Sequence, residues 1–216
     1  MLVTGFEGYG GRGINPAGEI AKSLDAKRIA GVTIKSAVLS VSYVELAPRL
    51  SALIDEHKPA AVICLGLWPG EAMIRLERFG VNKNDFEIPD NVGTLQHAEI
   101  ETGGPTARAA SLPLEEIQAR LLAQGIPARL SSTAGNFLCN ALLYTALGLL
   151  EKKGLKIPCG FIHIPYLPEQ VAEIIQTTKV EQQLELHQRG DLSSMPLETS
   201  VAAVRTAIEV TLRGLS

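Results

Sequence analysis

The stretch from Ser131 to Tyr144 reads Ser-Ser-Thr-Ala-Gly-Asn-Phe-Leu-Cys-Asn-Ala-Leu-Leu-Tyr, and it changes character halfway along. Its first half is small and polar, whereas its second half begins an apolar helix that we expect to reach about Lys153. Cys139 then lies in or near the first helical turn, where free N–H groups and a partial positive charge favour an anion. We therefore expect this thiol to ionise more readily than an ordinary cysteine. The competing interpretation is a small buried core residue, as free cysteines often are.

Short apolar strands and amphipathic helices alternate on both sides of this stretch. We expect strands over 2–6, 32–41, 60–65, 73–82 (with a bend), 128–132 and 160–165. We expect helices over 16–27, 44–57, 114–124, the segment from Cys139 to about 153, 171–189 and 197–213. Asn15 and Pro16 suit the N-cap and first position of their helix. The alternation predicts one α/β domain over residues 1–216, with a mostly parallel twisted sheet and helices on both faces.

The composition excludes several classes of protein. The chain has 216 residues, of which 46% are hydrophobic and 20% charged, and its net charge of −3 offers no basic surface for nucleic acid. No apolar run reaches the roughly 18 residues of a membrane span, and we expect no leader peptide at the N-terminus. The three cysteines, an odd number without paired spacing, argue against disulfides and against a zinc site. We expect a cytoplasmic soluble protein.

Cysteine catalysis needs a base beside the thiol and a third group that orients the base. Of the four histidines, only His163 lies in an apolar strand, between two isoleucines. The alternative role for His163 is a hydrogen-bonded core residue. Glu77 is the carboxylate candidate, and its alternative is the exposed phase of an alternating strand.

A glycine-rich loop over residues 5–13 follows the first expected strand and raises a nucleotide-binding alternative. Its glycines are badly spaced for a dinucleotide fingerprint, since Asn15 and Pro16 intervene before the helix. No Gly-Lys-Ser/Thr follows either, so the triphosphate-binding loop is missing.

Several short blocks, taken in order, closely resemble the pyrrolidone-carboxylate peptidases (pyroglutamyl peptidase type I). These blocks are Thr4-Gly-Phe-Glu, Glu77-Arg, Ile88-Pro-Asp-Asn, Ser132-Thr-Ala-Gly with Phe-Leu-Cys-Asn, and Gly160-Phe-Ile-His-Ile-Pro-Tyr-Leu-Pro-Glu-Gln. The resemblance implies a single α/β domain and a cytoplasmic homotetramer without a cofactor. It also implies a thiol protease that removes N-terminal pyroglutamate from peptides, and it does not suggest nucleic acid or a membrane as a partner.

The resemblance carries a catalytic triad onto Glu77, Cys139 and His163. It also implies that Phe6, Tyr9 and Phe137 form an aromatic substrate pocket, for which ordinary core packing is the alternative. Asn15 resembles a polar contact to the substrate ring, and its alternative role is the helix N-cap described above.

The chain departs from the family pattern around the expected pocket. Gly8 and Tyr9 replace a proline and a phenylalanine, Leu67 replaces a glutamine, and Glu87 replaces an arginine before Ile-Pro-Asp-Asn. Segment 171–194 also looks longer than in typical members. We expect Glu87 to turn outward to a cation such as Arg75 or Arg78. A weakly active or inactive relative that binds capped peptides is the alternative function.

Overall fold

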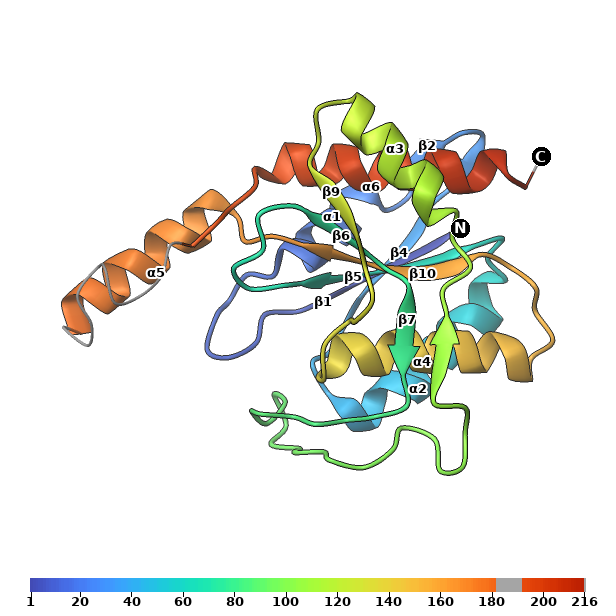
Figure 1. The fold of residues 1–216 in the computed structure, drawn as a ribbon, viewed down its shortest axis with the longest axis horizontal. Coiled ribbons are helices and arrows are strands. Elements are labelled where there is room, and N and C mark those ends of the chain that lie inside the picture. Colours follow the sequence, from blue (N-terminus) through green and yellow to red (C-terminus); the bar gives the residue numbers. More distant parts are fainter. Residues whose placement is uncertain (182–191, 216) are drawn as a thin grey trace.

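The computed structural model describes residues 1–181 and 192–215, and a six-stranded sheet lies at its centre (Figure 1). The sheet has the strand order β4-β1-β5-β10-β6-β9. Its strands are β1 (Leu2–Phe6), β4 (Lys35–Leu39), β5 (Val62–Leu67), β6 (Ile74–Glu77), β9 (Ala128–Ser131) and β10 (Cys159–Ile164). The helices are α1 (Pro16–Leu24), α2 (Tyr43–His57), α3 (Leu114–Ala123), α4 (Leu138–Lys152), α5 (Pro168–Glu181) and α6 (Leu197–Arg213).

The six-stranded sheet is parallel except where β10 meets β6. This arrangement confirms the expected mostly parallel α/β sheet. The chain passes from β5 to β6 through residues 68–73, a connection too short for a helical crossover, and β6 runs against β5. β10 fills the position between them, so it lies in the middle of the sheet.

Helices cover both faces of the sheet, as expected. On one face α1, α3 and α6 pack in a core that includes Ile20, Ile117 and Ile208. On the other face α2 and α4 pack in a core that includes Leu50 and Leu142. Figure 1 shows α6 with α3 on one side of the sheet and α4 with α2 on the other.

The expected helices and strands appear with small shifts at their ends. The bend expected within 73–82 separates β6 from β7 (Phe79–Val81), which pairs with β8 (Ala107–Ala109) outside the main sheet. The expected strand 32–41 is divided into β3 (Val32–Thr33) and β4, and β3 pairs with β2 (Arg28–Ile29). The expected helix 171–189 corresponds to α5, which begins at Pro168; the rest of that prediction and part of segment 171–194 lie outside the described residues.

Candidate active site

A cavity of about 310 Å³ opens where β1, β5 and β10 end and α4 begins. Its wall includes Cys139 and His163 together with all four expected substrate residues, which are Phe6, Tyr9, Asn15 and Phe137. The ends of parallel strands are where sites form in α/β sheets, because the loops that follow them converge there. The sequence therefore brings residues far apart in the chain to one place.

Cys139 is the second residue of α4, in the expected first turn. The N-cap of this helix, Phe137, has no side-chain acceptor, so no side chain caps the first N–H groups. Asn140 fixes the helix start: its side-chain oxygen accepts from Val81 N at 2.8 Å, and its Nδ2 donates to the carbonyl oxygens of Val81 and Lys83 at 2.9 Å. The Cys-Asn pair thus places the thiol at the cavity and anchors the turn that carries it.

Gly66 in β5 makes room for the thiol. A Cβ atom at this position would lie 2.7 Å from Cys139 Sγ and 2.7 Å from Phe161 Cζ. Since real Cβ atoms essentially never come so close to a neighbour, only glycine allows the thiol and the ring to occupy their positions together.

Two rows of register partners across the sheet, with one row between them, hold the groups behind the thiol. In the first, Gly66 of β5, His163 of β10 and Arg75 of β6 are register partners. In the other, two residues away along the strands, Phe161 lies opposite Glu77. Because side chains of residues two apart share a strand face, both rows point to the α4 side of the sheet.

The His163 imidazole is held by Glu77. Nδ1 of His163 lies 2.8 Å from Oε1 of Glu77, and both side chains are buried, at 1% and 0% exposure. A carboxylate can only accept here, so Nδ1 carries the proton and Nε2 of the neutral ring is free to accept one. The exposed-phase interpretation of Glu77 is therefore wrong, because β6 is covered on both faces.

The expected easy ionisation of Cys139 is wrong. Burial, together with the nearby charge of Glu77 and the Cys64 thiol, raises the pKa of the Cys139 thiol to about 12. Burial also lowers the pKa of His163, although the hydrogen bond and charge of Glu77 act in the opposite direction. Desolvation outweighs the helix N-terminus, and the resting pair is a neutral thiol and a neutral imidazole.

Among the described residues no hydrogen bond joins the Cys139 thiol to His163. Catalytic hydrogen bonds in free enzymes are commonly long and shorten when substrate binds. The two groups nevertheless lie on the wall of the same cavity.

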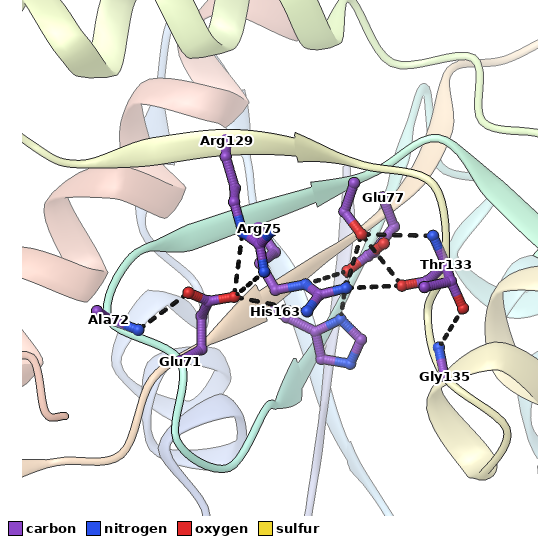
Figure 2. A network of polar contacts seen from close by, with 9 residues as sticks. Glu71, Ala72, Arg75, Glu77, Arg129, Thr133, Gly135 and His163 are labelled. Carbon is purple, nitrogen blue, oxygen red and sulfur yellow. Dashed lines mark hydrogen bonds and ion pairs between the residues drawn. The ribbon is translucent and has the colours of Figure 1, made fainter. Parts of the chain in front are cut away.

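A network of charged groups extends from Glu77 away from the cavity (Figure 2). Arg75 donates to Glu77 and contacts Glu71, and Arg129 donates to Glu71 from the neighbouring strand β9. Burial alone would raise the pKa of Glu71, but hydrogen bonds from Arg129 and the Ala72 N–H hold it below its ordinary value. The carboxylates and guanidinium groups thus alternate in sign through the network.

Trp68 is a cavity residue that sequence reasoning missed. Its ring meets the His163 ring edge-on, with 4.9 Å between centroids, and the Arg75 guanidinium lies 3.6 Å from its centroid. Trp68 is the single tryptophan of the chain and directly follows the central strand β5. Its position after that strand was the signal available in the sequence.

The expected substrate residues differ in the contacts that their side chains already make within the protein. The aromatic rings of Tyr9 and Phe137 lie 6.1 Å apart, and Phe137 also packs edge-on against Phe86 at 4.6 Å. Asn15 caps α1, since its Oδ1 accepts from Ala17 N at 3.1 Å, and its Nδ2 donates to Glu7 O at 2.9 Å. Asn15 therefore has the N-cap role and also lies on the cavity wall.

The glycine-rich loop does not present a free helix N-terminus. Pro16 has no N–H, and Asn15 already binds the N–H of Ala17. The first two positions of this helix thus offer no free donor to a phosphate.

Glu87 is exposed, as expected, but the expected partner is wrong, because in the described part of the chain Glu87 pairs with neither Arg75 nor Arg78. Glu87 lines the cavity, and its Oε1 accepts from Asn136 Nδ2 at 3.1 Å. Arg75 is instead buried against Glu77, which leaves it unavailable to Glu87. A negative charge therefore lies on the wall of the cavity, where the resemblance led us to look for a positive one.

The Ile88-Pro-Asp-Asn block holds this wall in place. Asp90 accepts from the N–H groups of Val92 and Thr94 and, at 2.8 Å, from that of Tyr43 at the start of α2. Asn91 donates to the carboxylate of Glu7 at 3.1 Å. These bonds tie the loop to α2 and to the loop after β1, so the block has a structural role at the edge of the cavity.

Within residues 1–181 and 192–215, no three histidine, cysteine or acidic side chains form a group suited to a metal ion. The same part of the chain contains no helix with both the length and the apolar character needed to cross a membrane.

Comparison with known proteins gives one consistent result. The sequence profile of a family described as pyroglutamyl peptidase matches residues 1–214. The chain is 39% identical over 216 residues to a pyrrolidone-carboxylate peptidase of Pyrococcus furiosus, covering 100% of this chain and 99% of that protein. It is also 39% identical over 212 residues to one from Bacillus cereus (strain G9842), covering 98% of this chain and 92% of the relative.

The fold is similar to solved structures of the same kind of protein. A crystal structure of pyrrolidone carboxyl peptidase from Pyrococcus furiosus superimposes with a TM-score of 0.91 at 39% identity. The superposition covers 100% of this chain and 99% of that one.

Proposed function

The chain belongs to the pyroglutamyl peptidase family and is a cysteine peptidase that hydrolyses the bond after an N-terminal pyroglutamyl residue; we propose that Cys139, His163 and Glu77 perform this reaction. One observation carries the assignment. Buried Glu77 holds Nδ1 of His163 at 2.8 Å, and the same cavity wall carries Cys139 at a helix N-terminus. A thiol, an imidazole and an orienting carboxylate are the parts that nucleophilic hydrolysis of an amide requires.

The reaction begins from the neutral thiol and imidazole. Nε2 of His163 takes the thiol proton as Sγ of Cys139 attacks the pyroglutamyl carbonyl carbon, and the carbonyl oxygen becomes an oxyanion. The uncapped N–H of Cys139 at the start of α4 donates to that oxyanion. The C–N bond then breaks, the imidazolium returns its proton to the leaving amine, and a thioester remains on Cys139.

Water completes the cycle. His163 takes a proton from water as the oxygen attacks the thioester, and the thiol then leaves with that proton restored. Glu77 stays ionised throughout and stabilises the imidazolium that forms in each half of the reaction. Because free Cys139 has a pKa of about 12, proton transfer has to accompany the attack.

The cavity suits a neutral ring. Pyroglutamate has a lactam in place of a free α-amine, so it needs an apolar slot with a few hydrogen bonds. Phe6, Tyr9 and Phe137 supply apolar surface, and Asn15 lies among them as the polar group. We assign these residues to substrate binding.

Hydrolysis of a pyroglutamyl chromogenic amide under reducing conditions tests the activity. The expected result is release of the chromophore by the native chain, loss of release on Cys139→Ser, and little release from the matching alanyl amide. Binding of a pyroglutamyl peptide without hydrolysis at high enzyme concentration would point instead to an inactive relative.

We further propose a homotetramer in the cytoplasm. The projection of α5 from the body of the molecule, with Ile175 at 42% exposure, supports a role for this helix in contacts between subunits (Figure 1). The three free cysteines suit a reducing compartment. Light scattering at micromolar concentration should give four times the monomer mass, and cell fractionation should recover the chain with cytoplasmic markers; a monomer or a membrane fraction would contradict these proposals.

A further inference from the structure

Arg75 lies beside the catalytic groups although the proposed reaction does not use it. In the sheet register it is the direct partner of His163, and it is two residues before Glu77 on the same strand. Register partners have Cβ atoms roughly 5 Å apart, so their side chains are neighbours on one face of the sheet. Arg75 is also buried, with 6% of its side chain exposed.

The guanidinium of Arg75 is held on several sides. Its Nη2 donates to Ser131 Oγ at 2.7 Å and to the carbonyl oxygen of Thr133 at 2.9 Å. Its Nη1 lies 3.5 Å from Glu71. The flat face of the group stacks on Trp68. A cation with this many partners has one orientation, and the planar fork of arginine is what allows it.

From this fixed position Arg75 determines how Glu77 meets the histidine. Nε of Arg75 donates to Glu77 Oε1 at 3.0 Å, and this is the same oxygen that accepts from His163 Nδ1 at 2.8 Å. The other oxygen, Oε2, is buried and has no hydrogen-bond partner in the described part of the chain. Figure 2 shows both bonds converging on Glu77. Without the arginine, nothing in this set of contacts decides which carboxylate oxygen faces the imidazole.

Arg75 reaches the imidazole by a second route. Trp68 has the guanidinium over its ring, and the same ring lies nearly perpendicular to the His163 ring at 4.9 Å between centroids. The histidine is therefore constrained by the arginine both through Glu77 and through the indole.

We propose that Arg75 is a positioning residue for hydrolysis, which fixes Glu77 and Trp68 so that the imidazole of His163 keeps its proton on Nδ1 and leaves Nε2 for the Cys139 thiol. This inference rests on the proposed roles of these groups. It assigns to Arg75 a contribution to turnover beyond its contribution to folding.

The charges around His163 predict a signature that a purely structural arginine would lack. The charged and titratable groups around the ring are Glu77 and Arg75 from β6, Glu71 from the preceding loop and Cys139 from α4. Tyr9 and Glu87, from the loops after β1 and β7, lie on the wall of the same cavity. Burial lowers the pKa of His163, Glu77 raises it, the Arg75 charge lowers it and the Glu71 charge raises it. Removing the Arg75 charge should therefore raise the pKa of His163 and move the acid limb of kcat/KM to higher pH.

Arg108 offers a matched control far from the cavity. Its side chain is 10% exposed, donates to Glu101 and Glu151, and lies over the Tyr144 ring at 4.2 Å. Arg108→Met thus removes a buried, stacked, ion-paired arginine, as Arg75→Met does. Both variants should lose thermal stability, but only Arg75→Met should lower kcat for a pyroglutamyl amide, by about 10- to 100-fold.

Two further measurements separate positioning from folding. In a Glu77→Gln background, Arg75→Met should lower kcat by less than about 3-fold more, because the group through which it acts is already changed. Arg75→Lys keeps the charge but loses the planar fork, so it should lower kcat about 10-fold and leave the acid limb in place. Native kcat in Arg75→Lys, equal losses in the two methionine variants, or additive losses with Glu77→Gln would each overturn the proposal.

Alkylation of Cys139 by iodoacetamide across pH tests the same idea without a substrate. Its acid limb should shift upward in Arg75→Met and stay at the native position in Arg108→Met. If the native chain shows this limb and the limb shifts in Arg75→Met, yet the native chain fails to hydrolyse pyroglutamyl amides, the proposed function fails while the effect of Arg75 on His163 stands. An unshifted limb in Arg75→Met contradicts the role of Arg75 whatever the substrate.

Discussion

Replacing Gly66 by alanine should impair catalysis far more than folding. The added Cβ would lie 2.7 Å from Cys139 Sγ and from Phe161 Cζ, whereas ordinary contacts begin at 3.4 Å. Both clashes must be relieved, and each requires a relative movement of about 0.7 Å. The Phe161 ring is fully buried and can move little, whereas Cys139 borders the cavity, so we expect strand β5 to shift slightly away from the ring and the sulfur to make the larger movement.

A displacement of this size has a large kinetic effect. Moving a reacting atom by about 1 Å costs on the order of 10²-fold in rate, which corresponds to about 2.7 kcal/mol in the barrier. Overpacking should cost about 1–3 kcal/mol of folding free energy, or a few degrees in Tm for a chain of this length. Kinetics with a pyroglutamyl amide and a thermal melt measure the two effects separately, and kcat should fall with little change in KM.

Gly160→Ala is the matched control. Gly160 lies in the neighbouring strand β10, and a Cβ there would meet Leu112 Cδ1 at 2.6 Å, on the face of the sheet away from the thiol. This variant should lose similar stability and keep the native kcat. If Gly66→Ala keeps the native kcat, or if Gly160→Ala lowers kcat as much as Gly66→Ala does, the position of the thiol does not depend on the space that Gly66 leaves.

Three further outcomes follow from the site. Cys139→Ser should lower kcat/KM by about 10³-fold or more, whereas Cys64→Ser and Cys159→Ser should change only Tm. If peptide mapping of the inactivated protein found iodoacetamide on Cys64 or Cys159, that residue and not Cys139 would be the nucleophile. Because burial lowers the pKa of His163 below its ordinary 6.5, its base form predominates at neutral pH, and kcat/KM should stay level down to about pH 6.5 and fall only below it; a fall that begins above pH 7 would contradict the neutral pair. Glu87→Ala should change kcat for a neutral amide by less than about 5-fold. It should reduce the preference for arginine over glutamate at the position after pyroglutamate by roughly 5-fold, since one screened charge contact is worth about 1 kcal/mol. If the ratio of kcat/KM for the two peptides is unchanged, the charge of Glu87 does not act on the leaving group.

The repeating pattern of the sequence predicted most of the fold. Helices such as α2 and α6 have apolar faces of period 3.6, and Asn15 with Pro16 marks the start of α1, so local chemistry sufficed for them. The alternation in β6 was misleading, because Arg75 and Glu77 look like an exposed face and are buried. Their burial depends on the register between β6 and β10, which is set by contacts distant in the sequence.

The candidate site was predicted as a set of residues but not as an electrostatic environment. The position of Cys139 in the first turn of α4 follows from its neighbours in sequence. Its raised pKa follows from burial and from the charge of Glu77, and neither is visible locally. Likewise, the sequence shows that Arg75 and Arg78 are near Glu87 in the chain and could pair with it. Only the folded chain shows that Arg75 already has two carboxylate partners, Glu71 and Glu77.

The central position of β10 has a consequence for biosynthesis. His163 is 86 residues after Glu77 in the chain, and its strand separates β5 from β6 in the finished sheet. During synthesis on the ribosome, both neighbours of β10 and the Cys139 thiol emerge first, and the sheet stays in two parts until the last of its strands arrives. A nascent or truncated chain thus carries the nucleophile without its base. For a protease this order is protective, because the chain can hydrolyse other peptides only after β10 has joined the two parts of its own sheet.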